Sequence, residues 1–461
     1  MKACNFLKFK CLILISLLAV AILPAQNVEL TPSMRSLLSK TESFGLKKFP
    51  ISFWSYTNLA QHGKYMTENE VKSWADAGFT VPQSPGFDSN DPEQKGQIKQ
   101  MLGWAEKYGM KLIVTDPRGY AKGGNEGNPD ENYGDGIRAA LKDFGNHPAL
   151  FGFHVGDEPD AAFKNTFFEC LRIQKELAPN LHPFANLLPH FPGIEKRAGT
   201  DTWPNYLDEY ARKTNADLVA YDCYAQMKPG EEGWNDYFRN LKFHREASVR
   251  NGIPFWNTIL SVGHFEYRMP NQDELRWQFY TSIAGGANGI AWFFYYMREP
   301  HGNYRMAPVD EFWNKTQGYY DLQRIQNGFH RRYGDLFNKL VSTRVCFYGR
   351  SYGNGEFFSP DSFISDITIT RGINSLMIAE FIDAGGRPYV MFVNNSTDKN
   401  SCVQVSFPKK AKIFSWDWSG KEFEGAAYCS DQPKIDADGK QLHSLWLAPG
   451  QEAVYRIELA K

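Results

Sequence analysis

The stretch Leu150-Phe151-Gly152-Phe153-His154-Val155-Gly156-Asp157-Glu158-Pro159 joins a short apolar run to two carboxylates and a proline. The run is too short for a helix and lacks strict apolar–polar alternation, which is typical of a parallel strand buried on both faces. The two carboxylates stand where that strand would end. A proline at this point favours the first turn of a following helix. The stretch therefore predicts a strand, a polar turn and a helix.

The same unit recurs along the chain at intervals of roughly 30–40 residues, which is the period of a strand–helix unit in a (β/α)8 barrel. Helix signals separate the apolar stretches. Thr67 precedes Glu70 as in a capping box, and Gly78 follows the helix that they begin. Eight units predict a (β/α)8 TIM barrel. The apolar stretches are Pro50–Tyr56, Phe79–Gln83, Lys111–Thr115, Leu150–Val155, Pro183–Leu188, Leu218–Tyr224, Pro254–Leu260 and Gly289–Tyr295.

From Val341 onward the pattern changes to short alternating stretches separated by turn signals such as Asp383-Ala384-Gly385-Gly386. Alternation with turns at short intervals predicts a small all-β sandwich. We expect residues 26–340 to form the barrel and residues 341–461 to form the sandwich. A structural role for the sandwich is favoured over a role as a glycan-binding module.

The N-terminus has the features of a secretory signal peptide. Positive charges at Lys2, Lys8 and Lys10 accompany an apolar run from Cys11 to Leu23, and the small residue Ala25 follows. The run is too short for a membrane anchor, and no later segment approaches the ~20 apolar residues that a membrane span requires. We expect residues 1–25 to be removed and the protein to be exported through a Sec-type pathway, to the periplasm or the medium.

Composition and charge exclude several classes of function. The net charge of −1 and the absence of a basic stripe argue against nucleic acid as a partner. The sequence lacks a phosphate-cradling glycine loop, metal-type cysteine or histidine spacing and a Ser/His/Asp order, so we expect no cofactor and no metal. The 12 Trp, 23 Tyr and 34 Phe residues can fill a core or line a cleft that grips sugar rings. A carbohydrate is the expected partner, and the oligomeric state stays open.

The active site of a (β/α)8 barrel lies at the carboxyl ends of its strands. Carboxylates, amides and aromatic rings gather there, and this inventory suits a neutral, polyhydroxylated ligand. For each tryptophan, packing in the core is the competing explanation. The expected substrate-binding residues are Trp54, Tyr56, Asp116, Asp157, Asn186, Tyr224, Trp256, Asn257, His264, Trp292 and Tyr295.

The segment Phe151–Pro159 resembles the fourth strand of clan A glycoside hydrolases, where Asn-Glu-Pro or a similar tripeptide places the general acid/base. Ile253–Trp256 and Gly285–Ile290 resemble strands seven and eight of the bacterial β-galactosidases of that clan. The resemblance implies that Glu158 is the general acid. The chemistry agrees, because Asp157 and aromatic walls would raise the pKa of Glu158 towards the working pH. The competing interpretation is that Asp157 and Glu158 cap the following helix.

Strand seven departs from the pattern of the clan. The clan places a nucleophilic glutamate at its end, whereas Pro254–Leu260 contains no carboxylate. Asp222 and Glu266 are the expected replacements, and Asp116 is a third candidate. A displaced partner could lie farther from Glu158, which would favour an inverting mechanism.

The sequence therefore predicts a glycoside hydrolase that acts on an oligo- or polysaccharide. One alternative is a non-catalytic glycan-binding barrel that has lost the strand-seven nucleophile. Another is a barrel enzyme of different chemistry, such as a lyase or a deacetylase.

Overall fold

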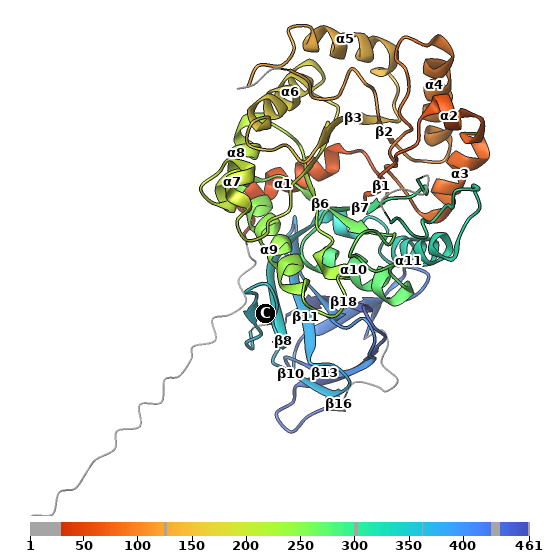
Figure 1. Cartoon of the computed structure of the whole chain (residues 1–461). Coiled ribbons are helices and arrows are strands. Elements are labelled where there is room, and N and C mark those ends of the chain that lie inside the picture. Colours follow the sequence, from red (N-terminus) through yellow and green to blue (C-terminus); the bar gives the residue numbers. More distant parts are fainter. Residues whose placement is uncertain (1–28, 124–126, 299–302, 362, 426–433, 460–461) are drawn as a thin grey trace, which may run out of the picture.

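The computed structural model describes residues 29–123, 127–298, 303–361, 363–425 and 434–459. The chain forms a barrel of parallel strands surrounded by helices, with antiparallel sheets packed beside it (Figure 1). The expected signal peptide, residues 1–25, lies outside the described residues. Within the described ranges, none of the helices combines the length and the apolar character that a membrane span needs.

The barrel sheet has the order β1-β7-β6-β5-β4-β3-β2, and all of its neighbouring strands are parallel. The first strand pairs with the last, with Ile51 opposite Ile290, as ring closure requires. Seven of the eight predicted apolar stretches contain a strand, and the predicted TIM-like barrel is confirmed. The strands are β1 Ile51–Phe53, β2 Leu112–Val114, β3 Leu150–Asp157, β4 Phe184–Leu187, β5 Val219–Asp222, β6 Phe255–Leu260 and β7 Gly289–Phe293.

The predicted second strand, Phe79–Gln83, is not a regular strand, although it lies between β1 and β2. Thr80 N–H donates to the carbonyl of Ile51 at 2.9 Å, and the N–H of Ile113 donates to the carbonyl of Pro82 at 3.0 Å. Pro82 has no N–H to return, which interrupts the ladder. The segment therefore closes the barrel through backbone hydrogen bonds on both sides without forming a strand of its own.

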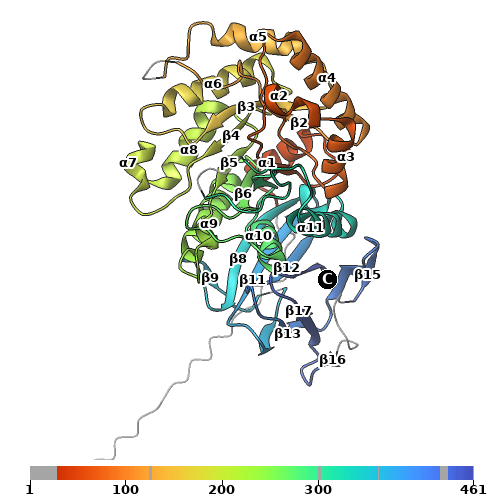
Figure 2. The ribbon, with the colours of Figure 1, turned by 45° about the vertical axis from the view of Figure 1, so that its right-hand side comes forward.

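Helices surround the barrel (Figure 2). The predicted helix start is present, since the Thr67 hydroxyl accepts from the Glu70 N–H at 3.4 Å, and Gly78 ends that helix at φ 95°. The Glu70 carboxylate accepts from Tyr296 instead of completing a capping box. The helices are α1 Pro32–Ser43, α2 Leu59–His62, η1 Gly63–Tyr65, α3 Glu68–Ala77, α4 Pro92–Lys107, α5 Tyr133–Phe144, α6 Lys164–Leu177, α7 Ile194–Ala198, α8 Trp203–Thr214, η2 Ala225–Met227, α9 Trp234–Asn251, α10 Gln272–Ala284, α11 Gln317–Tyr333 and η3 Leu336–Lys339.

Aromatic side chains fill the amino-terminal end of the barrel. Phe44, directly after α1, is fully buried, and its ring centroid lies 5.4 Å from that of Phe151 and 5.9 Å from that of Trp256. His182 contacts the carbonyl of Ser43 at 3.1 Å, which fixes the end of α1 to the barrel. In the described part of the chain this packing closes the amino-terminal end of the barrel, so a ligand would approach the interior from the carboxyl ends of the strands.

The C-terminal strands form two sheets, with the orders β10-β13-β17-β16 and β15-β14-β18-β12-β11-β8-β9. Apolar side chains from both sheets share one buried core, which includes Val403 of one sheet and Ile378 of the other. The predicted all-β sandwich is confirmed. Its strands are β8 Leu340–Gly349, β9 Glu356–Phe357, β10 Asp366–Arg371, β11 Ser375–Asp383, β12 Pro388–Asn394, β13 Ser401–Phe407, β14 Lys412–Trp416, β15 Glu422–Glu424, β16 Lys434–Ile435, β17 Gln441–Leu447 and β18 Glu452–Glu458.

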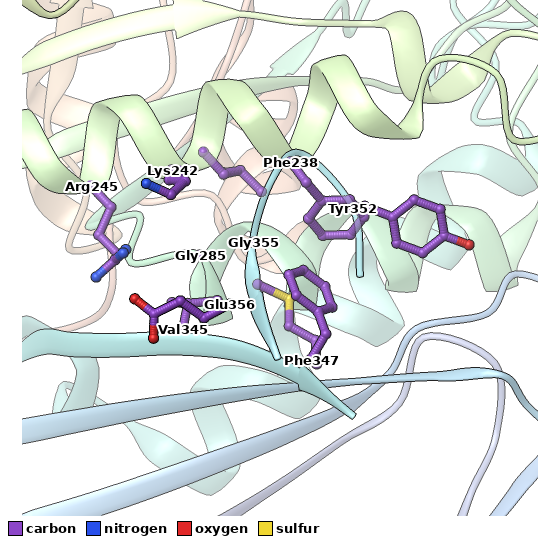
Figure 3. A pocket seen from close by; sticks show the side chains of 11 residues that line it. Phe238, Lys242, Arg245, Gly285, Val345, Phe347, Tyr352, Gly355 and Glu356 are labelled. Atoms are coloured by element: carbon purple, nitrogen blue, oxygen red, sulfur yellow. The ribbon is translucent and has the colours of Figure 1, made fainter. Parts of the chain in front are cut away.

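Side chains of the barrel and the sandwich pack closely where the two meet. A cavity between α9 and the strands β8 and β11 is lined by Phe238, Arg245 and Phe347, among others (Figure 3). Its volume of about 20 Å³ holds about one water molecule. This cavity is too small for a sugar.

A buried ion pair joins the two parts, since Arg332 of α11 contacts the carboxylate of Glu452 on β18. Glu452 also accepts from the Tyr333 hydroxyl at 3.0 Å. We expect Glu452→Ala to lower the free energy of unfolding by about 3–5 kcal/mol, because it removes one partner of a buried ion pair. Glu458→Ala on the same strand removes a half-exposed partner of Arg456 and should cost less than about 1 kcal/mol. Urea unfolding of both variants checks this, and equal losses would contradict it.

Candidate active site

The end of β3 presents Asp157 and Glu158 through an irregular turn. The pairing of β3 with β4 shifts register between His154 and Gly156, and Glu158 has a φ of 42°. A residue with a side chain loses about 1–2 kcal/mol in the left-handed region, and such strain clusters at functional sites. The Glu158 N–H donates to the carbonyl of Asn186 at 2.9 Å, which holds the turn in place. The sequence predicts a polar turn here but not its left-handed conformation.

One amide joins carboxyl groups from two strands. The side-chain N–H2 of Asn186 on β4 donates to Asp157 Oδ1 at 3.0 Å and to Asp222 Oδ1 at 2.9 Å. Thr258 on β6 donates to the Asn186 carbonyl oxygen at 3.3 Å and so fixes which way the amide points. Because both Oδ1 atoms contact the same nitrogen of Asn186, the carboxyl groups of Asp157 and Asp222 lie close together. Four neighbouring strands therefore converge on one acidic cluster.

Glu158 completes this cluster. Its carboxyl group shares a hydrogen bond with Asp222, and one of its oxygens lies 3.4 Å from the guanidinium of Arg197. Burial and the charge of Asp157 raise the pKa of Glu158, whereas Arg197 and the hydrogen bond with Asp222 act in the opposite direction. One third of the side chain is exposed to solvent, so a ligand can reach it.

Asp222 has the most strongly shifted carboxyl group of the three. Burial raises its pKa well above the ordinary value, and the charges of Glu158 and Asp157 raise it further. Hydrogen bonds from Asn186 and Tyr224 oppose the shift without cancelling it. Because no cation compensates Asp222 among these contacts, its carboxyl group holds a proton more readily than that of Glu158.

Aromatic side chains stand around the acidic cluster. Tyr56 is 38% exposed, and burial together with the charge of Asp157 raises the pKa of its hydroxyl. The ring of Tyr224 stacks on that of Phe293 at 5.0 Å. His264 lies beside them, with its ring centroid 5.6 Å from that of Tyr224, and burial lowers its pKa to about 4. The predicted residues Tyr56, Tyr224 and His264 are thus brought together next to the carboxyl groups.

Trp54 and His154 lie beneath these residues at the open, carboxyl-terminal end of the barrel, which we call the mouth. Trp54 is 6% exposed, and its ring centroid lies 4.9 Å from that of His154. The imidazole of His154 is within 3.2 Å of the Gln83 amide, and burial lowers its pKa to about 4, so it is neutral at physiological pH. His154 packs against Trp54 and carries no charge into the site.

Four predicted substrate-binding residues point away from the mouth. Trp292 is fully buried, and its indole N–H donates to Gln326 of α11 at 3.3 Å. Asn257 donates to Ser282 of α10, and Tyr295 stacks on Phe53 at 4.4 Å. Side chains of a strand alternate between its two faces, and Trp292 and Asn257 lie on the face covered by helices. Tyr295 follows the end of β7 and packs towards Tyr319 of α11. Trp256 does point inward, but it fills the closed end of the barrel against Phe151 and Phe184.

The other predicted carboxylates have different partners. Asp116 is fully buried and accepts from the guanidinium of Arg118 at 2.7 and 2.9 Å, which is a structural ion pair. Glu266 is exposed, and its carboxylate lies 2.9 Å from the ammonium of Lys228. β6 contains no carboxylate, as the sequence indicates. Among the three expected partners of Glu158, only Asp222 contacts it.

A second hollow opens beside the cluster, between the chain that follows β1 and the chain that follows β7. This rim cavity has a volume of about 570 Å³. Tyr56 belongs to both the mouth and the rim cavity. Arg197, Thr258 and this cavity were not predicted from the sequence. Arg197 and most of the cavity lie several residues beyond a predicted strand end, and Thr258 lies within an apolar stretch. The main residues that line the rim cavity are Tyr56, His62, Lys64, Tyr65, Arg298 and Trp313.

Comparisons with known proteins support the fold. No family model matches the sequence, and no curated protein matches it significantly. A β-galactosidase from Bacillus circulans sp. alkalophilus has a similar structure, with a TM-score of 0.55 and 10% identity over 90% of this chain and 99% of that one. The predicted resemblance to glycoside hydrolases with a TIM-like barrel is therefore confirmed as a resemblance of fold.

Two further solved structures are similar at lower TM-scores. A family 39 glycoside hydrolase from Bacteroides cellulosilyticus WH2 has a TM-score of 0.48 and 12% identity, over 89% of this chain and 82% of that one. A β-galactosidase from the psychrophilic Marinomonas ef1 has a TM-score of 0.46 and 12% identity over 63% of this chain. The present chain covers 62% of the Marinomonas enzyme, less than two thirds of its length.

The raised pKa of Asp222 predicts a pH-dependent cost to stability. Ionised Asp222 is disfavoured in the folded state, so the wild type loses stability as pH rises above the ordinary aspartate pKa. The Asp222→Asn variant avoids this cost. We expect its melting temperature to rise relative to that of the wild type between about pH 4 and pH 8.

Asp217 is the matched control of opposite sign. Burial alone would raise its pKa, but hydrogen bonds from His182 and Lys175 hold the pKa below the ordinary value. Asp217→Asn should therefore lose stability relative to the wild type as pH rises towards the ordinary aspartate pKa, and this loss should stay constant from about pH 5 to pH 8. Thermal unfolding of the three proteins at several pH values checks both signs. Parallel curves for the two variants would contradict the account.

Proposed function

We propose that the protein is a glycoside hydrolase whose catalytic pair is Glu158 and Asp222. The observation that carries this proposal is the acidic cluster of Asp157, Glu158 and Asp222, joined through the Asn186 amide at the open end of the barrel, beside aromatic rings. Hydrolysis of a glycosidic bond needs one carboxyl group that is protonated and one that is ionised. With one proton between Glu158 and Asp222, one carboxyl group is protonated and the other is ionised.

The surroundings of the two groups favour Asp222 as the acid and Glu158 as the nucleophile. Asp222 retains the proton because its charge has no compensating cation among its contacts, and Glu158 ionises because Arg197 stabilises its charge. The family resemblance implies the opposite roles, with Glu158 as acid. The charges around the two groups, and not their positions on the strands, favour Asp222 as acid and Glu158 as nucleophile.

The reaction then follows two steps. Asp222 protonates the leaving oxygen while Glu158 attacks the anomeric carbon, so that the glycosidic bond breaks and a glycosyl ester forms. Ionised Asp222 next removes a proton from water, which attacks the same carbon and releases Glu158. Tyr56 and Tyr224 are placed to contact the sugar, and Asn186 keeps Asp222 oriented. Trp54 lies beneath them.

A specific observation favours a second candidate, a glycan-binding barrel without catalysis. β6 holds no carboxylate, although glycoside hydrolases of the resembled clan carry their nucleophile on the corresponding strand. In this case the acidic cluster would accept hydrogen bonds from sugar hydroxyls only. Release of new reducing ends from a panel of glycans decides between the two candidates. Binding without any release would favour the second.

Substitution of the pair tests the catalytic assignment. We expect Glu158→Gln and Asp222→Asn each to lower kcat by about 10²–10⁴-fold or more, because each removes an acid, base or nucleophile. Glu266→Gln should keep at least about half of the activity, since Glu266 contacts Lys228 and not the cluster. Initial rates with the best glycan of the panel provide the measurement. A larger loss in Glu266→Gln than in Asp222→Asn would contradict the assignment.

The spacing of the carboxyl groups predicts the stereochemistry. Inverting enzymes keep their carboxyl groups about 6.5–9.5 Å apart to admit a water molecule. Here Glu158 shares a hydrogen bond with Asp222, and Asp157 reaches Asp222 through a single amide. The inverting mechanism considered from the sequence is thus disfavoured. We expect the first product observed by proton NMR to retain the anomeric configuration of the substrate, and inversion would contradict this expectation.

A further inference from the structure

We propose that the rim cavity binds a negatively charged sugar residue, a uronate or a sulfated sugar, and that Arg298 recognises its anionic group. The inference rests on the proposed function, since it names the class of substrate that the same mouth would accept. Four observations carry it: a guanidinium without a counter-charge among the described residues, a cavity of suitable size, a second cation and a direct connection to the acidic cluster.

Arg298 is held by aromatic rings and not by a carboxylate. Its guanidinium carbon lies 4.1 Å from the ring centroid of Tyr56 and 5.4 Å from that of Tyr304, and Nη1 donates to the Tyr304 hydroxyl at 3.3 Å. In the part of the chain that the structure describes, no carboxylate forms an ion pair with Arg298. Stacking leaves the edge of the guanidinium available, and that edge matches the two oxygens of a carboxylate or sulfate.

The cavity next to Arg298 suits a sugar. Its volume of about 570 Å³ falls in the range of ~300–1,000 Å³ that is usual for small-molecule sites. Trp313 and Tyr65 stack on each other at 4.3 Å with an interplanar angle of 14°, which forms a flat aromatic wall.

Charged side chains of both signs line the cavity. Lys64 also lines it, lies 4.8 Å above the ring of Tyr65 and has no ion pair with a described carboxylate. Two acidic residues line the cavity as well. Asp310 Oδ1 accepts from the backbone N–H groups of residues 312 and 314, so these hydrogen bonds hold the Asp310 side chain within the turn that follows it. Glu311 is exposed at the opening.

Tyr56 connects the cavity with the acidic cluster. Its ring carries the stacked guanidinium of Arg298, and the charges of Asp157 and Asp222 act on its hydroxyl. A sugar in the rim cavity is therefore a near neighbour of the bond that the pair would cleave. Arg298 would select substrates with an anionic residue next to that bond.

Binding to matched pairs of glycans tests the inference. The probes are a galacturonate hexamer and its carboxyl-reduced form, and an O-sulfated galactan hexamer and its desulfated form. Titration calorimetry on the mature wild-type protein should give tighter binding for at least one anionic hexamer than for its neutral partner. The pair that shows the difference identifies uronate or sulfate. If neither anionic hexamer binds more tightly than its neutral partner, the inference is overturned.

Variants then locate the recognition. Arg298→Gln should lower the ratio of anionic to neutral affinity by about 10- to 100-fold, as expected for loss of a charged hydrogen-bonding partner. Arg298→Lys should recover part of this ratio, since it keeps the charge without the planar fork. Arg371→Gln, an exposed arginine on β10, is the control and should leave the ratio unchanged. An unchanged ratio in Arg298→Gln overturns the inference.

The outcome for this inference is separate from that for the hydrolase. Selective binding of an anionic hexamer through Arg298 without new reducing ends would support the inference and refute the proposed hydrolysis. Cleavage of glycans with a ratio that Arg298→Gln does not alter would support hydrolysis and refute the inference.

Discussion

The arrangement of the site depends on one shared side chain, the amide of Asn186. It donates to Asp157 at 3.0 Å and to Asp222 at 2.9 Å, and Thr258 fixes its orientation from β6. Carboxyl groups this close repel each other when ionised, and little water surrounds Asp222 to relieve the repulsion. The cluster can form only if donors from neighbouring strands hold it and a proton remains within it. The contact of Glu158 with Asp222 follows from that constraint.

The barrel supplies the rigidity that such a cluster needs. Aromatic packing around Phe44 and Trp256 closes one end, and the buried ion pair of Arg332 with Glu452 joins the helices to the sandwich. The left-handed conformation of Glu158 persists because its N–H is bonded to the next strand. Strain and like charges at one end of the fold are thus balanced by packing elsewhere.

Periodicity in the sequence was enough to predict the barrel and the sandwich, and the position of Glu158 at a strand end was enough to predict its place at the mouth. Finer features depend on contacts between distant segments. Pro82 interrupts the second strand, and Trp292 and Tyr295 lie near a strand end but pack towards α11. The choice of Asp222 over Glu266 required knowing which carboxyl group contacts Glu158. Arg298 could not be predicted as a binding residue from the sequence, because its proposed role depends on the absence of a carboxylate partner among the described residues.

The central claim is that the cluster holds a proton at neutral pH and that Asp222 carries it. Carbon-13 NMR of protein labelled at the aspartate and glutamate carboxyl carbons measures this directly, with Asp222→Asn and Glu158→Gln used to assign the two signals. The account predicts that near pH 7 the Asp222 carboxyl carbon has the chemical shift of a protonated group and that of Glu158 has the shift of an ionised group. Two fully ionised carboxylates at that pH would contradict the account.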